Sequence, residues 1–169
     1  GFGNWTVADE DVILETITDA NVACGFHAGD PDTMMRLCQR AAELGVTIGA
    51  HVAFHDLRGF GRNYIAVPPK TLANDVRYQI GALEAFTTAA GTTLQYVKPH
   101  GALYHSAASR PEHAQAVIEG MSSFGRVIPI MCQTGTVIAR LAAQAGIPVI
   151  AEAFMDRAYT ADGLLVPRG

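Results

Sequence analysis

Short apolar runs alternate with longer amphipathic segments along this 169-residue chain. The apolar runs have the length of buried strands and lie at residues 22–24, 46–50, 94–97, 126–131 and 148–151. Strands that are apolar on both faces belong to parallel sheets covered by helices. The alternation therefore predicts an α/β fold built from strand–helix units, either an open doubly wound sheet or a barrel.

The segments between the runs predict the helices. Residues 31–44 place apolar side chains at three- and four-residue spacing, behind a candidate N-cap at Asp30 and before a stop at Gly45. Three further helices are expected at residues 68–90, 111–121 and 135–145. No Gly-rich dinucleotide fingerprint follows any strand, which favours a (β/α) barrel over a nucleotide-binding open sheet.

Five strand–helix units are fewer than a closed barrel needs. The chain opens on Gly1-Phe2-Gly3 without an initiator Met, and residues 165–169 provide no closing element. We therefore expect residues 1–169 to form a single barrel domain that is truncated at both ends.

Composition excludes several classes of protein. With 49% hydrophobic residues and a formal net charge of −4, the chain is neither disordered nor equipped with a basic surface for nucleic acid. It has no apolar run long enough to span a membrane. Its three cysteines, Cys24, Cys38 and Cys132, are too few and too scattered for a disulfide framework, which favours a reducing compartment such as the cytoplasm.

Titratable side chains gather where the predicted strands end. His27, His51 and His100 each follow an apolar run, and Lys98 ends one. The carboxyl ends of parallel strands meet at one mouth of a barrel, where active sites lie. The sequence therefore predicts a site containing these three histidines, with Lys98 as an anion-binding or carbonyl-polarising cation.

Structural interpretations of the histidines compete with this prediction. A single histidine at a strand tip is commonly a hydrogen-bonded structural residue, although three at equivalent positions weaken that interpretation. His51 and His55 have the spacing of metal ligands on a helix, but they fall in an expected loop. His105 and His113 lie near expected helix starts, where a surface or capping role is simpler.

The charged residues have structural alternatives too. Capping of a helix alone explains Asp30, and Lys98 could extend its charge to solvent from a strand end. Asp156 and Arg157 could form an ion pair that shapes the loop after the last strand. No GxxxxGK[ST] or GxSxG segment is present, so neither a Walker-type ATP site nor a serine-hydrolase elbow is expected.

Several of these segments resemble the LamB/YcsF family. The similar segments are residues 23–30, 48–51, 59–62, 78–83, 97–104, 156–159 and 162–168. The resemblance implies an irregular TIM-like barrel of about seven strands, of the glycoside hydrolase/deacetylase type, here incomplete. One departure is local: residues 52–56 read VAFHD where the family often has PGYPD, so His55 is not carried over.

The resemblance also implies an activity. Bacterial members form the A component of a three-component 5-oxoprolinase that opens 5-oxo-L-proline to L-glutamate with ATP, together with subunits B and C. ATP would then be bound by a partner. We expect His27 or His51 as base, Lys98 as anion binder and His100 as an orienting or acid group. Expected substrate-binding residues are Asp30, Arg62, Tyr104, Asp156 and Arg157.

Two alternatives stay open. Barrels of the deacetylase type hold a divalent metal with an Asp and two His, and His27 and His51 could supply the two imidazoles for hydrolysis of an N-acetyl sugar. The other alternative is a scaffold protein without catalysis of its own.

Overall fold

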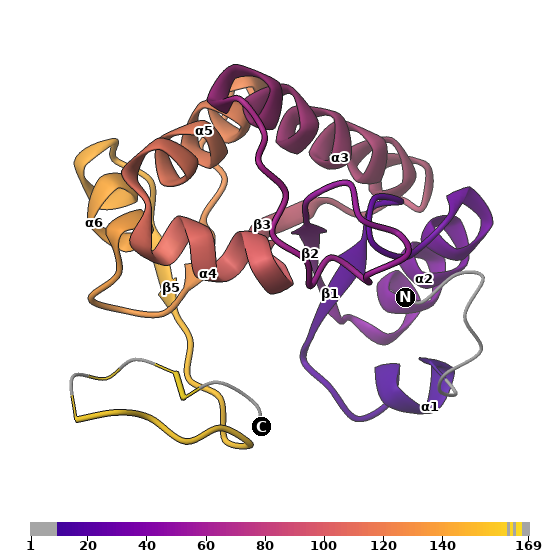
Figure 1. Ribbon diagram of the computed structural model, residues 1–169. Helices are drawn as coiled ribbons and strands as arrows, with labels where there is room; N and C mark the ends of the chain where they lie inside the picture. Colours follow the sequence, from indigo (N-terminus) through magenta and orange to yellow (C-terminus); the bar gives the residue numbers. More distant parts are fainter. Residues whose placement is uncertain (1–9, 162, 164, 167–169) are drawn as a thin grey trace.

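The computed structural model describes residues 10–161, 163, 165 and 166 and contains one parallel sheet (Figure 1). The strand order is β1-β2-β3-β4-β5, so strands consecutive in the chain are neighbours in the sheet. Because parallel crossovers are right-handed, an order that never reverses places the connecting helices on one face, as in a barrel wall. The α/β prediction is confirmed. The strands are β1 (Asp19–Ala23), β2 (Thr47–Val52), β3 (Leu94–Pro99), β4 (Ile130–Cys132) and β5 (Val149–Ala151).

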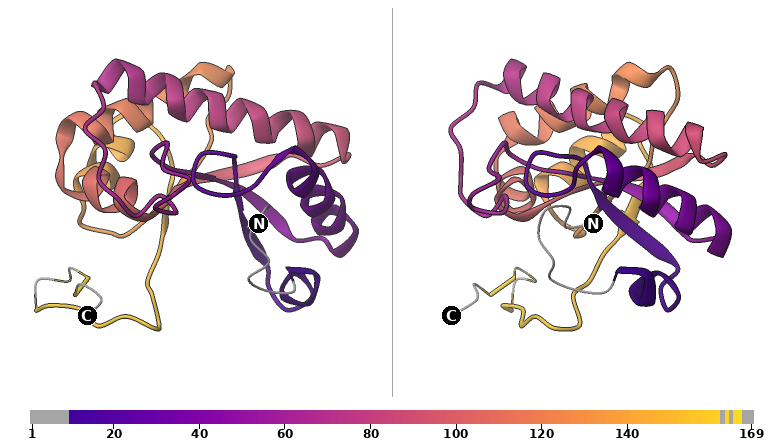
Figure 2. Two further views of the ribbon diagram at one scale, coloured as in Figure 1. Left: turned by 45° about the vertical axis from the view of Figure 1, so that its right-hand side comes forward. Right: turned by 90° about the vertical axis from the view of Figure 1, so that its right-hand side faces the viewer.

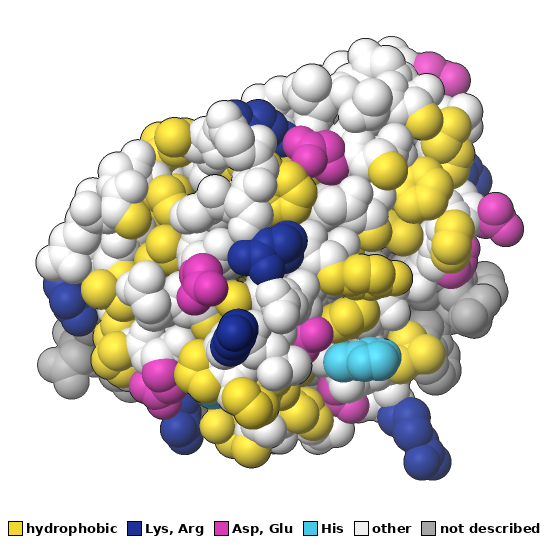
Figure 3. Space-filling view, turned by 90° about the horizontal axis from the view of Figure 1, so that it is seen from above, with side chains coloured by type: hydrophobic (Ala, Val, Ile, Leu, Met, Phe, Trp, Pro, Cys, Tyr) yellow, Lys and Arg dark blue, Asp and Glu magenta, His cyan; other side chains and the backbone are white. Residues whose placement is uncertain are grey.

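Helices cover the outer face of this sheet, and α3 lies above the strands in both views of Figure 2. The outer surface carries interspersed hydrophobic, acidic and basic side chains (Figure 3). None of the helices between residues 10 and 161 has the length and apolarity required to cross a membrane. The helices are α1 (Glu10–Leu14), α2 (Pro31–Leu44), α3 (Pro69–Ala89), α4 (Gly101–Ser109), α5 (Pro111–Met121), the 3₁₀ turn η1 (Ser122–Phe124) and α6 (Val137–Gln144).

The two faces of the sheet have different roles. On β2, the side chains of Ile48, Ala50 and Val52 belong to the hydrophobic core. Side chains alternate along a strand, so His51 points to the opposite, inner face. The parallel register pairs His51 with Lys98 on β3, so both emerge near the carboxyl ends of their strands on that inner face.

Most predicted elements are confirmed, with shifted ends. The helix at 31–44 begins where expected, because Asp30 Oδ1 accepts a 2.8 Å hydrogen bond from the Thr33 backbone N–H. The helix expected from residue 135 begins two residues later, because the Thr136 hydroxyl caps it. α4 was not predicted, and the strand expected at 126–131 is only three residues long, starting at Ile130.

All three cysteines, Cys24, Cys38 and Cys132, have free thiols and are buried. The chain ends on which the truncation prediction rests, Gly1–Gly3 and residues 167–169, lie outside the described residues.

Candidate active site

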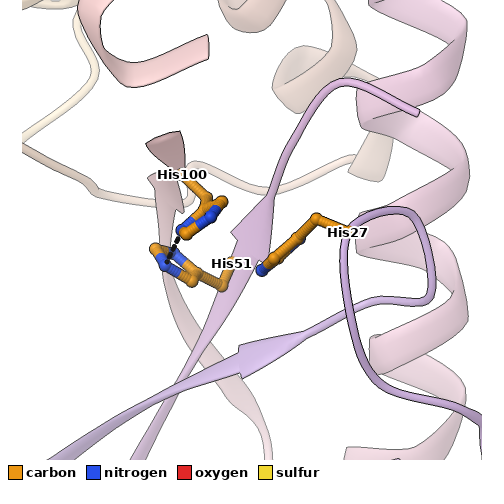
Figure 4. A group of neighbouring side chains, drawn as sticks. All are labelled: His27, His51 and His100. Atoms are coloured by element: carbon orange, nitrogen blue, oxygen red, sulfur yellow. Dashed lines mark hydrogen bonds between the residues drawn. The ribbon is translucent and has the colours of Figure 1, made fainter. Parts of the chain in front are cut away.

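Three histidines converge at the carboxyl ends of β1, β2 and β3 (Figure 4). His27 comes from the loop after β1, His51 from β2, and His100 immediately precedes α4. The His27 and His100 rings are stacked, with centroids 4.0 Å apart and planes inclined by 14°. The His51 ring meets His100 edge-on at 4.7 Å. The predicted gathering of these residues is therefore present in the structure.

Backbone carbonyls fix the orientation of two of the rings. His51 Nδ1 lies 3.0 Å from the Lys98 carbonyl oxygen, and His100 Nε2 lies 2.8 Å from that of Phe60. A carbonyl oxygen can only accept, so these two ring nitrogens carry the protons. The other nitrogens, His51 Nε2 and His100 Nδ1, face each other at 3.0 Å (Figure 4).

The loop after β2 is shaped to receive these rings. Phe60 adopts a left-handed backbone conformation (φ 55°), unusual for a residue with a side chain, and its carbonyl holds His100. Gly61 follows, also with positive φ. A Cβ at Gly61 would lie 2.8 Å from both His100 Cδ2 and His27 Cβ. Only glycine therefore fits between this loop and the two rings.

Burial keeps all three imidazoles neutral near pH 7. It lowers the pKa of His27 to about 3, with a further contribution from His100. Burial, followed by the neighbouring histidines and Lys98, lowers the pKa of His51 well below its usual range. Burial also lowers the pKa of His100. Neutral rings each offer one lone pair, so the cluster can accept protons or bind a cation.

A cavity of about 540 Å³ opens beside the cluster, a volume suited to a small molecule. It combines cationic, imidazole and aromatic groups. Its lining includes His51, Arg62, Lys98, His100, Tyr104, His105, Phe154 and Arg157.

An ion pair borders the cavity. The Lys98 ammonium contacts the carboxylate of Glu152, the residue after β5, and both side chains are only 11% exposed. Glu152 Oε2 and the Tyr104 hydroxyl are buried and have no hydrogen-bond partner among the described residues. Burial, reinforced by the Glu152 charge, raises the pKa of Tyr104, which therefore stays protonated. Tyr104 lines the cavity, and its hydroxyl also interacts with Glu152.

A model of the LamB/YcsF family matches residues 1–169, the whole of this sequence. The chain belongs to the LamB/YcsF family. It is 53% identical over 169 residues to the A subunit of 5-oxoprolinase from Streptomyces avermitilis, covering 100% of this chain and 68% of that protein. It is 52% identical to the corresponding protein of Nocardia farcinica with the same coverage.

A solved structure supports the fold of this LamB/YcsF chain. The crystal structure of a lactam utilization protein from Thermus thermophilus matches it with a TM-score of 0.94 at 42% identity. The match covers 99% of this chain and 68% of that one. The family and the barrel-type α/β fold expected from the sequence are confirmed.

The LamB/YcsF chain brings most of the predicted site residues together. The cavity is lined by His51, Lys98, His100, Arg62, Tyr104 and Arg157, and His27 stacks on His100. Two predicted substrate-binding residues, Asp30 and Asp156, are not among the lining residues. Asp30 instead caps α2 through both carboxylate oxygens, which accept from the Thr33 N–H and hydroxyl.

Sequence reasoning gave no role to Glu152, although its place directly after the last strand was a usable signal. His105 is exposed, as expected for a surface residue, and it also lines the cavity. His113 is buried against Ser106, with Nδ1 and Oγ 2.7 Å apart, so its expected surface position was wrong. His55 stacks on Phe26 at 4.5 Å and is not part of the histidine cluster, so the His51–His55 spacing forms no ligand pair.

Proposed function

We propose that this chain is the A component of an ATP-dependent 5-oxoprolinase, which opens 5-oxo-L-proline to L-glutamate. The observation that carries the proposal is the 53% identity over all 169 residues to a protein of that name. The cavity beside the three histidines supports it, because a small anionic substrate fits a concave site lined by Arg62 and Arg157.

The reaction needs activation, because a five-membered lactam is a stable amide that readily re-forms. Transfer of the γ-phosphoryl group of ATP to the lactam oxygen releases ADP and makes the ring carbon electrophilic. Water then attacks that carbon. The ring C–N bond breaks as the nitrogen takes a proton, which leaves an acyl phosphate on the opened chain. A second water hydrolyses this acyl phosphate, and glutamate and inorganic phosphate are formed.

The cationic side chains that line the cavity can bind the negative charges of the substrate and of the activated lactam. Arg62 and Arg157 both line it, and guanidinium groups bind carboxylates through paired hydrogen bonds. We assign the substrate carboxylate to them. Lys98 is paired with Glu152, so we assign it to the charge that develops on the lactam or phosphoryl oxygens rather than to the carboxylate.

Two groups beside the cavity can accept the proton of the attacking water. One is the neutral imidazole of His51, which lines the cavity while His27 lies against His100. The other is the Glu152 carboxylate, whose Oε2 is buried and has no hydrogen-bond partner among the described residues. The protonated Tyr104 hydroxyl is a donor for the leaving ring nitrogen or for the substrate carbonyl.

We assign ATP binding and phosphoryl transfer to partner subunits B and C. The relatives are named as one lettered component of 5-oxoprolinase, which implies a complex of several proteins, and this sequence has no Walker-type segment. We place the complex in the cytoplasm, because three buried free thiols suit a reducing compartment.

The histidine cluster favours one second candidate, a metal-dependent deacetylase acting on an N-acetyl sugar. The cluster offers three imidazole nitrogens within 4.8 Å of one another, which is compatible with such a metal. That function would need neither ATP nor partner proteins, so one assay separates the two candidates.

The test is glutamate release from 5-oxoproline, measured with and without ATP and with and without subunits B and C. The proposal predicts glutamate only when ATP and both partners are present. Glutamate release by B and C without this chain, or no release from the complete mixture, would contradict it. Acetate release from N-acetyl sugars by this chain alone would establish the deacetylase instead.

A further inference from the structure

The hydrogen bonds of His51 and His100 leave two unprotonated ring nitrogens that face each other. Each ring donates one N–H to a backbone carbonyl, that of Lys98 for His51 and that of Phe60 for His100. A neutral imidazole has only one N–H. Consequently His51 Nε2 and His100 Nδ1, 3.0 Å apart, both present lone pairs to each other.

Two facing lone pairs at this distance repel unless a positive charge lies between or beside them. A shared proton would make one ring an imidazolium. The surroundings oppose that charge, because the cationic side chains of Lys98 and Arg62 line the same cavity as both rings. A coordinated metal cation satisfies both lone pairs without protonating either ring.

The third histidine completes a ligand set. His27 is 2% exposed, and its Nδ1 has no hydrogen-bond partner among the described residues. One ring nitrogen of each of His27, His51 and His100 lies within 4.8 Å of the other two. We propose that these three side chains form a divalent transition-metal site at the carboxyl ends of strands β1, β2 and β3.

The groups that would orient these ligands are already in place. Ligating histidines generally donate their other ring N–H to a carbonyl or carboxylate, which fixes the tautomer. His51 and His100 both do so. Gly61 leaves the rings room to approach one another, since a Cβ there would meet His27 and His100 at 2.8 Å. The absence of a side chain at Gly61 therefore allows this loop to pack closely against two of the three ligands.

The donor set indicates the class of metal and the kind of site. Three neutral imidazoles suit Zn²⁺, Co²⁺, Ni²⁺ or Cu²⁺ and are poor ligands for Mg²⁺ or Ca²⁺. Three protein ligands leave a coordination position open, as in catalytic rather than structural sites. His51 and His100 line the cavity, so that position is open to a small molecule. A metal there would supply Lewis-acid chemistry.

A metal bound by His51 changes which group can accept the proton of the attacking water. Metal ligation uses the His51 lone pair, so the proton-accepting role falls to Glu152. The site itself does not depend on which reaction the chain catalyses, because it is read from the ligand geometry alone.

The test is metal binding by the purified chain, read by isothermal titration with Zn²⁺ and by the visible d–d absorption of Co²⁺. We expect one ion per chain. His27→Asn, His51→Asn and His100→Asn should each weaken binding by about 100-fold or more, since loss of a hydrogen-bond partner of a ligand alone costs about 10–100-fold. His55→Asn is the matched control, because His55 lies outside the cluster and should leave binding unchanged.

Circular dichroism of each variant shows whether it is folded, and Gly61→Ala provides a variant that leaves all three ligands in place. It should weaken binding by crowding His27 and His100. The absence of stoichiometric binding in the folded wild-type chain would overturn the proposal. Binding that survives all three asparagine variants would overturn it too. If the chain binds the metal but the complete mixture with ATP and subunits B and C releases no glutamate, only the proposed function is contradicted and the metal site stands.

Discussion

The ring of Tyr96 on β3 lies directly over Gly49 on β2, and its hydroxyl donates a 3.0 Å hydrogen bond to Asn21 Oδ1 on β1. One aromatic side chain therefore ties three neighbouring strands together on the inner face of the sheet. The next side chains on that face along β2 and β3 are His51 and Lys98, so the Tyr96 contacts lie directly beside the candidate site.

Replacing Gly49 with alanine should destabilise the fold. The new Cβ would overlap with Tyr96 Cε2, so the ring must move and its hydrogen bond to Asn21 is lost. Overpacking of a core typically costs about 1–3 kcal/mol, and we expect at least that in urea unfolding.

Gly81→Ala is the matched control, because Gly81 lies in α3 and a Cβ there makes only ordinary contact with Phe124 at 3.8 Å. Alanine in a helix should stabilise by about 0.5–1 kcal/mol. Equal effects of the two substitutions would contradict the close contact at Gly49.

Asp30→Ala separates the capping role from substrate binding. Removal of an N-cap should cost about 0.5–2 kcal/mol of stability, whereas Asp30→Asn should retain most of it. Hydrogen bonds from Thr33 lower the pKa of Asp30, so its contribution is present at neutral pH and is lost in acid. We expect the KM for 5-oxoproline to be unchanged in a folded Asp30→Asn variant. A raised KM would return Asp30 to the substrate site.

Lys98 and Glu152 should behave as a coupled pair. Lys98→Met leaves a carboxylate that is only 11% exposed without its cation, which should cost about 3–5 kcal/mol. The double variant Lys98→Met, Glu152→Gln should recover most of the stability but none of the activity. Denaturation of both single variants and the double variant forms the cycle. Additive losses of stability would show that the pair is not coupled.

His113 should make the stability of the chain depend on pH. Burial lowers its pKa in the folded state, so below the unfolded value of about 6.5 the unfolded chain binds the extra proton. The stability that neutral His113 contributes is therefore present above about pH 6.5 and declines as the pH falls.

A His113→Gln variant cannot titrate there, so its stability deficit relative to wild type should shrink between about pH 7 and about pH 5. Urea unfolding at several pH values measures this. A deficit that is constant over the range would show that His113 does not titrate on unfolding.

The sequence predicted the elements with strong local signals. Asp30, Pro31 and Gly45 bound α2 as expected, because capping, a first-turn proline and a left-handed glycine act within a few residues. α4 was not predicted, since its helical segment begins with Gly101 directly after His100 and has no side-chain cap. The short β4 depends on pairing with its neighbours, which no local pattern specifies.

The candidate site shows the same difference between what local sequence patterns predict and what they do not. The rule that parallel strands end at one edge was enough to bring His27, His51 and His100 together. The partners of these residues were not predictable. Phe60 reaches His100 only through a left-handed turn, and Glu152 meets Lys98 across 54 residues of chain. Such contacts depend on three-dimensional placement rather than on spacing.

The most direct test of the proposed site compares His51→Asn with His55→Asn in the complete ATP-dependent mixture with subunits B and C. The two histidines are four residues apart, but only His51 belongs to the cluster and lines the cavity. We predict that His51→Asn lowers kcat for glutamate release by at least about 100-fold, as expected for a general acid–base or metal-binding group, and that His55→Asn stays close to wild type. Full activity of a folded His51→Asn variant would contradict a catalytic role for the cluster and favour a scaffold role for this chain.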